Sequence, residues 1–267
     1  QGMTGACLLS ARTALQLGCG RVALSLLSEA DMHLPDIQRQ GQVPLLDLVF
    51  PEIMNKPLEL NLDFADTAIV GPGLGQGDEA LQWLYSVLKN NKGLDMVWDA
   101  DALNLLAANP QLRAGLKNYR EQHPDKALVL TPHPLEAARL LQTTTELIQD
   151  RRLETAREIS DLFDCTVVLK GAGTVVCNTA GAEINLTGGP ALGTAGSGDV
   201  LAGAIGAMMG QGLNGFDAAA FAVYLHGLAV GPTGAHGRLH VSHASEIAQR
   251  MKYCLNSLLD KGTCSNQ

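Results

Sequence analysis

Short apolar strands alternate with helices along most of this chain, and this alternation limits the folds that the chain can adopt. Strands joined through helices form right-handed crossovers, which place parallel strands in one sheet covered by helices on both faces. The sequence therefore predicts an α/β protein with a mostly parallel central sheet. The expected strands cover residues 21–26, 67–70, 96–98, 127–130 and 165–169, followed by a hairpin over 174–186. The expected helices cover residues 4–17, 78–89, 102–107, 134–141, 151–163, 198–209, 217–228 and 244–259.

The chain length favours a single domain. The chain has 267 residues, of which 46% are hydrophobic, and a chain of this size can bury one large core. No linker or internal repeat divides it, so we expect one domain over residues 1–267. Residues 28–62 are poorly periodic and rich in proline, which predicts a loop-rich excursion with short elements. Asp78 is expected to cap the helix that follows it.

Charge and cysteine content exclude several classes of protein. The chain carries 27 acidic residues against 19 lysines and arginines, a net charge of −8, so a basic nucleic-acid-binding surface is not expected. No apolar stretch reaches the ~18 residues that a membrane span needs. The six cysteines form no C-x-x-C pair and indicate reduced thiols in a reducing compartment. We therefore expect a cytoplasmic protein with no membrane partner, and the histidine spacing predicts no metal-ligating side chains.

The common nucleotide-binding motifs are absent or lie in the wrong setting. No Gly-Lys-Ser/Thr sequence is present, which excludes a Walker A loop. Glycine patterns begin at Gly18 and Gly210, but the first precedes a strand and the second links two helices, so neither fits a Rossmann turn. The hydrolase elbow Gly-x-Ser-x-Gly fails at Ser197, because Ala195 and Asp199 occupy its two glycine positions. Neither a Walker A loop nor a Rossmann turn can therefore hold a phosphate group in this chain.

Four turns follow the predicted strands, at residues 71–75, 99–104, 131–136 and 170–174. In open α/β sheets, ligands bind beyond the carboxyl ends of the strands. We therefore expect these turns to lie along one edge of the sheet and to form a common site.

The sequence Gly196-Ser197-Gly198-Asp199 opens a predicted helix. Small residues let the main chain approach a phosphate closely, and the free N–H groups and dipole of a helix start favour an anion there. Asp199 is therefore a candidate base that accepts a proton from a hydroxyl attacking phosphorus. The alternative is an ordinary first-turn acid.

The other turns each have a functional and a structural interpretation. Lys170 and the glycines of residues 170–174 suit a phosphate-binding loop, or else a glycine-rich hairpin entry. His133, held between two prolines, is either a site residue or a structural polar residue. The Asp99–Asn104 turn suits Mg²⁺ or a ribose, or caps the next helix, and Gly71–Gly75 forms either a plain turn or a floor for a ligand.

Together these stretches resemble the ADP-dependent NAD(P)H-hydrate dehydratases, which are ribokinase-like proteins of nicotinamide repair. The resemblance rests on six motifs in the family's order, which run through most of the chain. They are Gly2-Met3-Thr4-Gly5-Ala6, Gly71-Pro72-Gly73-Leu74-Gly75, Asp99-Ala100-Asp101-Ala102-Leu103-Asn104, Thr131-Pro132-His133-Pro134, Lys170-Gly171-Ala172-Gly173-Thr174 and Gly196-Ser197-Gly198-Asp199.

The resemblance implies a ribokinase-like three-layer sandwich and a lyase that removes water from hydrated NADH or NADPH. It implies ADP or ATP as the nucleotide, with Mg²⁺ as the expected metal ion. By the same analogy, Lys170, Gly171, Ala172, Gly173, Thr174 and Gly198 hold the nucleotide. Ala6, Gly73, His133 and Asp199 face the hydrated cofactor, with Asp199 as the catalytic base.

The resemblance also implies a possible fusion to, or pairing with, an epimerase domain that interconverts the hydrate epimers, and we expect a homo-oligomer. Two features depart from the family pattern. The strand and glycine turn that usually precede the position of Gly2 are missing, so we expect the chain to lack its native N-terminal strand. The late sequence His226-Gly227-Leu228-Ala229 is not followed by the usual acid.

Two alternative functions remain open at this point. A ribokinase-like kinase of a small alcohol or vitamin precursor shares the Gly-x-Gly-Asp chemistry, but Gly2–Ala6 and Thr131–Pro134 resemble the dehydratase more. A non-catalytic nucleotide-sensing domain is disfavoured because Lys170 and Asp199 are both present. The sequence does not distinguish ADP from ATP, or hydrated NADH from hydrated NADPH.

Overall fold

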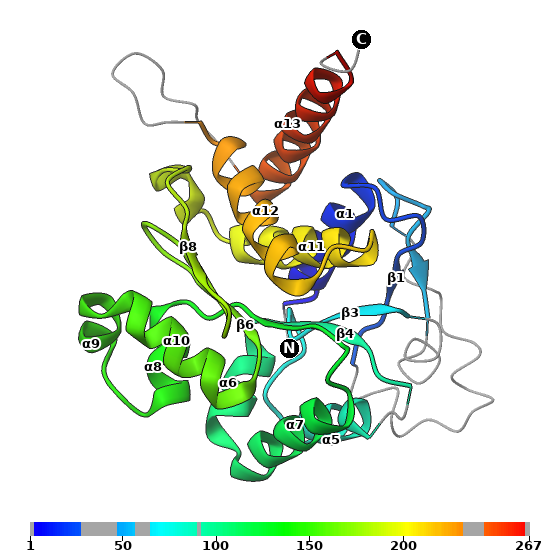
Figure 1. Cartoon of the computed structure of the whole chain (residues 1–267). Coiled ribbons are helices and arrows are strands. Elements are labelled where there is room, and N and C mark those ends of the chain that lie inside the picture. The colour runs from blue at the N-terminus through cyan, green and yellow to red at the C-terminus, as the bar shows by residue number, and fades with distance from the viewer. Residues whose placement is uncertain (1–2, 28–46, 57–64, 90–91, 232–242, 265–267) are drawn as a thin grey trace, which may run out of the picture.

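The computed structural model describes residues 3–27, 47–56, 65–89, 92–231 and 243–264 (Figure 1). Within these residues, six strands form one sheet in the order β3-β4-β5-β6-β7-β8. The first four strands are parallel neighbours, and the last two form an antiparallel hairpin, which confirms the mostly parallel sheet. The strands are β3 (Thr67–Val70), β4 (Asp95–Trp98), β5 (Leu128–Leu130), β6 (Thr166–Leu169), β7 (Val175–Cys177) and β8 (Ala182–Ile184). A separate parallel pair is formed by β1 (Ala23–Leu24) and β2 (Met54–Asn55).

Helices cover both faces of the sheet, so the described chain has three layers (Figure 1). One layer contains α1 (Thr4–Gln16), α11 (Ser197–Gly210), α12 (Gly215–Leu228) and α13 (Ala244–Cys264). The opposite layer contains α5 (Asp78–Leu88), α6 (Asp101–Ala108), α7 (Pro110–Gln122), α8 (Pro134–Leu141), α9 (Thr145–Asp150) and α10 (Arg152–Phe163). A short 3₁₀ helix over Pro190–Gly193 leads into α11.

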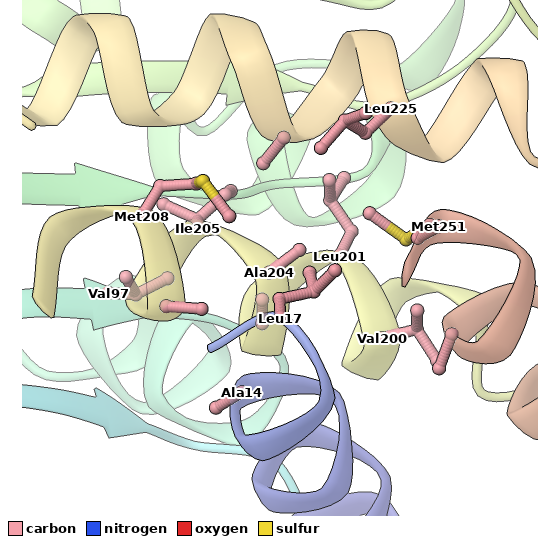
Figure 2. Close-up of a cluster of buried hydrophobic side chains, with 14 of the residues drawn as sticks. Ala14, Leu17, Val97, Val200, Leu201, Ala204, Ile205, Met208, Leu225 and Met251 are labelled. Atoms are coloured by element: carbon pink, nitrogen blue, oxygen red, sulfur yellow. The ribbon is translucent and has the colours of Figure 1, made fainter. Parts of the chain in front are cut away.

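Successive side chains of the strands enter two separate cores, because side chains of a strand alternate between its faces. Val97, Val129 and Val168 face the core beneath α11 and α12. Trp98 and Leu130 face the core on the other side of the sheet. Figure 2 shows the first core, where Leu201, Ile205 and Met208 of α11 lie between the sheet and the neighbouring helices.

Helix α1 packs closely against α11. A Cβ atom on Gly203 of α11 would lie 2.4 Å from the main-chain oxygen of Ser10 in α1, so only glycine permits this approach. The hydroxyl of Ser10 donates to the main-chain oxygen of Asp199 at 2.8 Å. The first turn of α11 is therefore held directly against α1.

Most predicted elements are confirmed within a few residues of their expected ends, and the differences are local. The predicted cap at Asp78 is wrong, because Gly77 occupies the capping position and Asp78 is the first helical residue. Helices α7 and α9 were not predicted, although Asn109 and Pro110 form a typical helix start for α7. Of the predicted excursion, residues 28–46 and 57–62 lie outside the described residues.

Three further findings concern the described part of the chain alone. Its five cysteines with described side chains, Cys7, Cys19, Cys165, Cys177 and Cys254, are all free thiols. None of its helices combines the length and the apolar character that a membrane crossing requires. Its histidines, cysteines and acids include no group of three or more placed to hold a metal ion.

Candidate active site

The predicted site turns meet at the carboxyl edge of the parallel strands, as expected. The ammonium group of Lys170, directly after β6, lies 2.7 Å from a carboxylate oxygen of Asp99, directly after β4. An added Cβ on Gly198, in the first turn of α11, would lie 3.4 Å from the Lys170 ammonium group. The loops after β4 and β6 and the start of α11 therefore enclose one charged centre.

Lys170 stays charged at this centre although it is largely buried. Burial works to lower the pKa of Lys170, but the carboxylates of Asp99 and Glu136 outweigh it, and the net pKa is raised. Glu136 lies 3.9 Å from the same ammonium group. A buried, charged lysine beside a helix start is a local donor for phosphate in a protein whose overall charge is negative.

Asp199 lies in the first turn of α11, beside this centre. Burial, and after it the charge of the nearby Asp99 carboxylate, raise the pKa of Asp199 to about 6 against the opposing effect of Lys170. A carboxylate with a pKa near 6 is ionised at neutral pH and still basic enough to accept a proton in a reaction. The surroundings of Asp199 therefore fit the role of a base.

The loop after β3 is shaped by its glycines and held by Asp101. Gly71 has a φ of 118°, and a Cβ there would overlap the main-chain oxygen of Asp99. Asp101 accepts a hydrogen bond from the main-chain N–H of Gly75 at 2.9 Å and another from the Gln76 amide at 2.8 Å. Neither acid of this turn caps α6, because its capping residue is Ala100, without a side-chain bond.

Ala6 and Gly73, both expected to face the hydrated cofactor, lie next to each other. A Cβ on Gly73 would lie 3.8 Å from the Cβ of Ala6 and only 2.5 Å from the main-chain oxygen of Met3. The loop after β3 and the start of α1 are therefore packed together. Any larger residue at Gly73 would push the two segments apart.

His133 has a structural role in addition to its predicted functional role. Its Nδ1 accepts a hydrogen bond from the main-chain N–H of Glu136 at 3.2 Å, and the Glu136 carboxylate accepts one from the N–H of His133 at 2.8 Å. This reciprocal pair is a capping box at the start of α8. Burial and the charge of Lys170 lower the pKa of His133, which favours the neutral form of its ring. The ring is half-exposed and open to a ligand.

Arg152, the first residue of α10, forms hydrogen bonds with the main chain of the predicted phosphate loop. Its guanidinium group donates to the main-chain oxygens of Leu169, Lys170 and Gly173 at 2.9, 3.3 and 3.3 Å. Gly171, with a φ of 141°, lies against the same guanidinium group. Because these carbonyl groups are engaged by Arg152, the loop is held in one conformation.

Sequence reasoning missed three residues that build this centre: Ser10, Glu136 and Arg152. Glu136 follows His133 by three residues, which is the spacing of a capping box, so that signal was present. Burial raises the pKa of Glu136 to about 7, although Lys170 opposes this rise. No sequence pattern marks Ser10 or Arg152, because their partners are main-chain groups of distant segments.

Replacing Arg152 with alanine should destabilise the phosphate loop. The three carbonyl groups share one donor nitrogen, Nη2 of Arg152, so they count as about one charged hydrogen bond. We therefore expect a loss of about 1.5–3 kcal/mol in unfolding free energy. Nucleotide affinity should fall as well, measured by calorimetric titration with ADP. Arg151→Ala, one residue away, is the matched control. Equal ADP affinity in the two variants would contradict this role.

The carboxylates at this centre suit Mg²⁺ only when phosphate groups supply further ligands. Asp99 is paired with Lys170, Glu136 with His133 and Lys170, and Asp101 with the loop after β3, which leaves Asp199 as an oxygen ligand near the predicted phosphate site. Protein-bound Mg²⁺ often takes one or two carboxylates and completes its shell with substrate phosphates and water. The arrangement therefore suits a metal ion that arrives together with a nucleotide.

Comparison with known proteins agrees with this geometry. The family model for NAD(P)H-hydrate dehydratase matches residues 1–250. The chain is 39% identical over 242 residues to the ADP-dependent (S)-NAD(P)H-hydrate dehydratase of Neisseria meningitidis, covering 85% of this chain and 72% of the relative. It is 38% identical to the bifunctional NAD(P)H-hydrate repair enzyme Nnr of Escherichia coli, covering 85% of this chain but only 40% of that enzyme.

A solved structure supports the same conclusion. The ADP/ATP-dependent NAD(P)H-hydrate dehydratase of Bacillus subtilis, co-crystallised with ATP and Mg²⁺ and soaked with CoA, superposes with a TM-score of 0.72 at 26% identity. The match covers 96% of this chain and 87% of that one. The expected ribokinase-like three-layer architecture is thereby confirmed. This chain belongs to the NAD(P)H-hydrate dehydratase family.

Proposed function

We propose that this protein removes water from hydrated NADH or NADPH and restores the reduced cofactor, with ADP or ATP as the phosphoryl donor. The observation that carries the proposal is the buried charged centre at the start of α11, where Lys170, Gly198 and Asp199 come together. A phosphoryl group bound by a helix start and a buried lysine lies within reach of a carboxylate base. Family membership supports the same activity.

In this proposal each predicted residue has a defined task. The loop over residues 170–174 and Gly198 bind the nucleotide phosphates through main-chain N–H groups and the Lys170 ammonium group. Asp199 accepts the proton of the ring hydroxyl as that oxygen bonds to phosphorus. The bound nucleotide supplies the phosphoryl group that turns the hydroxyl into a better leaving group. Loss of phosphate and of a proton from the neighbouring ring carbon then restores the double bond.

Ala6, Gly73 and His133 form the substrate side of the proposed site. The close contact of Ala6 with Gly73 offers a small-residue surface against which a flat ring can lie. His133 presents a half-exposed imidazole that is held by its contacts with Glu136. Its fixed orientation suits recognition of a polar group on the substrate. We propose these residues as the nicotinamide-binding surface.

The test mixes the protein with hydrated NADH and Mg²⁺, with and without ADP or ATP, and follows the near-ultraviolet absorbance of reduced nicotinamide. We expect recovery of the absorbance only when a nucleotide is present, and the faster nucleotide is the preferred donor. A folded protein that binds nucleotide but restores no absorbance would overturn the proposal. That outcome would favour a kinase of a small alcohol.

We also propose the setting in which the protein works. Its E. coli relative is bifunctional and much longer than the matched region, which supports an epimerase activity fused to or acting beside this domain. Tyr253 and Leu259 of α13 are each 60% exposed, which supports a homo-oligomer in which apolar side chains are covered. Free thiols support a cytoplasmic location.

A further inference from the structure

His226 of α12 is a buried polar residue that the proposed reaction does not use. Only 6% of its surface is exposed, and its Nε2 atom has no hydrogen-bond partner among the residues that the structure describes. Buried polar atoms are almost always paired, because an unpaired one destabilises the folded protein. An apolar side chain at this position would avoid that cost, so core stability alone does not explain a histidine here.

The ring of His226 lies between the start of α11 and the charged centre. Burial, and with it the charge of Lys170, lower the pKa of His226 to about 4, against the opposing effect of a hydrogen bond with the main chain of Ser197. A bond that raises the pKa of a histidine is one that the ring donates, so the carbonyl oxygen of Ser197 is the acceptor. Since Nε2 is unpaired, the donated proton is on Nδ1 of an uncharged ring.

The part of α12 that carries His226 is itself held in place by its neighbours. A Cβ atom on Gly227 would lie 1.9 Å from the hydroxyl oxygen of Thr187, so only glycine permits this contact. The same hydroxyl donates to the main-chain oxygen of Tyr224 at 3.1 Å. On the other side, Leu225 packs into the core shared with α11 (Figure 2). The ring is therefore presented to α11 from a fixed support.

The turn that His226 contacts carries the groups proposed for phosphate binding and proton transfer. Ser197 is the first residue of α11, and its hydroxyl donates to the main-chain oxygen of Leu192 at 2.6 Å. The hydroxyl of Ser10 in α1 donates to the main-chain oxygen of Asp199 at 2.8 Å. The contact from His226 is the third, so α1, α12 and the 3₁₀ helix all hold this turn. The free N–H groups of a helix start bind phosphate only when they are aligned on it.

We propose that His226 is a positioning residue, which fixes the first turn of α11 through the main chain of Ser197 and so aligns its N–H groups and the Asp199 carboxylate. His226 acts through this turn and touches neither the nucleotide nor the hydrated cofactor. The inference rests on the proposed function, because it assigns the same helix start to phosphate binding.

The test compares His226→Leu with His226→Asn. Asparagine places its amide nitrogen near the position of Nδ1 and can still donate to Ser197, whereas leucine cannot. We expect the leucine variant to bind ADP about tenfold more weakly, measured by calorimetry, and to lose about tenfold in kcat with hydrated NADH. Its Tm should equal or exceed that of the wild type, because the unpaired Nε2 is gone. Asparagine should restore ADP affinity to within about threefold of the wild-type value.

Leu225→Ala is the matched control, because this neighbouring residue of α12 is fully buried in the core. The control should lower the Tm through lost packing but leave ADP affinity unchanged. Wild-type ADP affinity in the His226→Leu variant would overturn the proposal. So would a loss of affinity that asparagine does not restore, or an equal loss in the control. A drop in the Tm of the leucine variant as large as that of the control would overturn it too, by showing a structural role.

The ADP titration also separates this proposal from the proposed function. A wild-type protein that binds ADP but restores no NADH would contradict the proposed activity, and the comparison of ADP affinities would still decide the role of His226. A wild-type protein that binds no ADP would overturn both.

Discussion

Replacing Asp199 with asparagine should lower kcat for dehydration of hydrated NADH by about 100- to 10,000-fold, which is the usual contribution of a positioned acid or base. Asparagine keeps the shape of the side chain at the start of α11 but cannot accept the proton. The main-chain oxygen of residue 199 can still accept the hydrogen bond from Ser10, so the α1–α11 contact is retained. The affinity for ADP, measured by calorimetry, should change little.

Asp217→Asn is the matched control, because Asp217 is the first-turn acid of α12, the next helix, and is exposed. This control should retain wild-type kcat. Turnover within threefold of wild type in the Asp199→Asn variant would remove Asp199 from the reaction.

The pH profile provides a second readout of the same group. Burial raises the pKa of Asp199 to about 6, and a base works only when it is deprotonated. The value of kcat/KM should therefore fall as the pH is lowered through about 6, and this acid limb should be lost in the Asp199→Asn variant. An unchanged acid limb in the variant would assign the titration to another group, such as Glu136.

Replacing Lys170 with methionine should have the largest effect on stability. The variant leaves two buried carboxylates, Asp99 at 1% exposure and Glu136 at 4%, without their cation. Removing one partner from a buried ion pair costs about 3–5 kcal/mol, which can be measured as the loss of unfolding free energy in urea. Nucleotide binding should be lost as well, because the only described ammonium group at the charged centre is gone.

A double variant separates the loss of pairing from a general packing defect. Adding Asp99→Asn to Lys170→Met removes one of the stranded charges, so the double variant should be more stable than the sum of the two single effects predicts. Lys117→Met, at an exposed position on α7, is the control and should change stability little. Strict additivity of the two single variants would contradict the pairing of Lys170 with Asp99.

Much of the fold was predictable because local patterns and packing agree. The core strands and the helices that cover them show clear apolar periodicity, and the parallel order follows from their alternation. The sequence predicts that Lys170 and Asp99 lie at the same edge of the sheet, since the parallel strands β4 and β6 both end there. The pairing itself depends on side-chain reach, which the sequence does not show.

The parts that escaped prediction depend on contacts between distant segments. Helix α7 has a low apolar content, so only its start at Asn109 and Pro110 marks it in the sequence. The dual role of His133 depends on its bond with Glu136, and the support of the phosphate loop depends on main-chain carbonyls that meet Arg152. Such contacts leave no periodic trace in the sequence, because they involve main-chain groups or a single distant partner.

The most direct test of the central claim is the phosphate balance of the reaction, followed by ³¹P NMR while reduced nicotinamide is measured by absorbance. Starting from hydrated NADH, ADP and Mg²⁺, the account predicts one AMP and one orthophosphate for each NADH restored, with no phosphorylated product accumulating. Restoration of NADH without nucleotide consumption would contradict phosphoryl transfer at this site. A phosphorylated product that accumulates without NADH would show a kinase instead of a dehydratase.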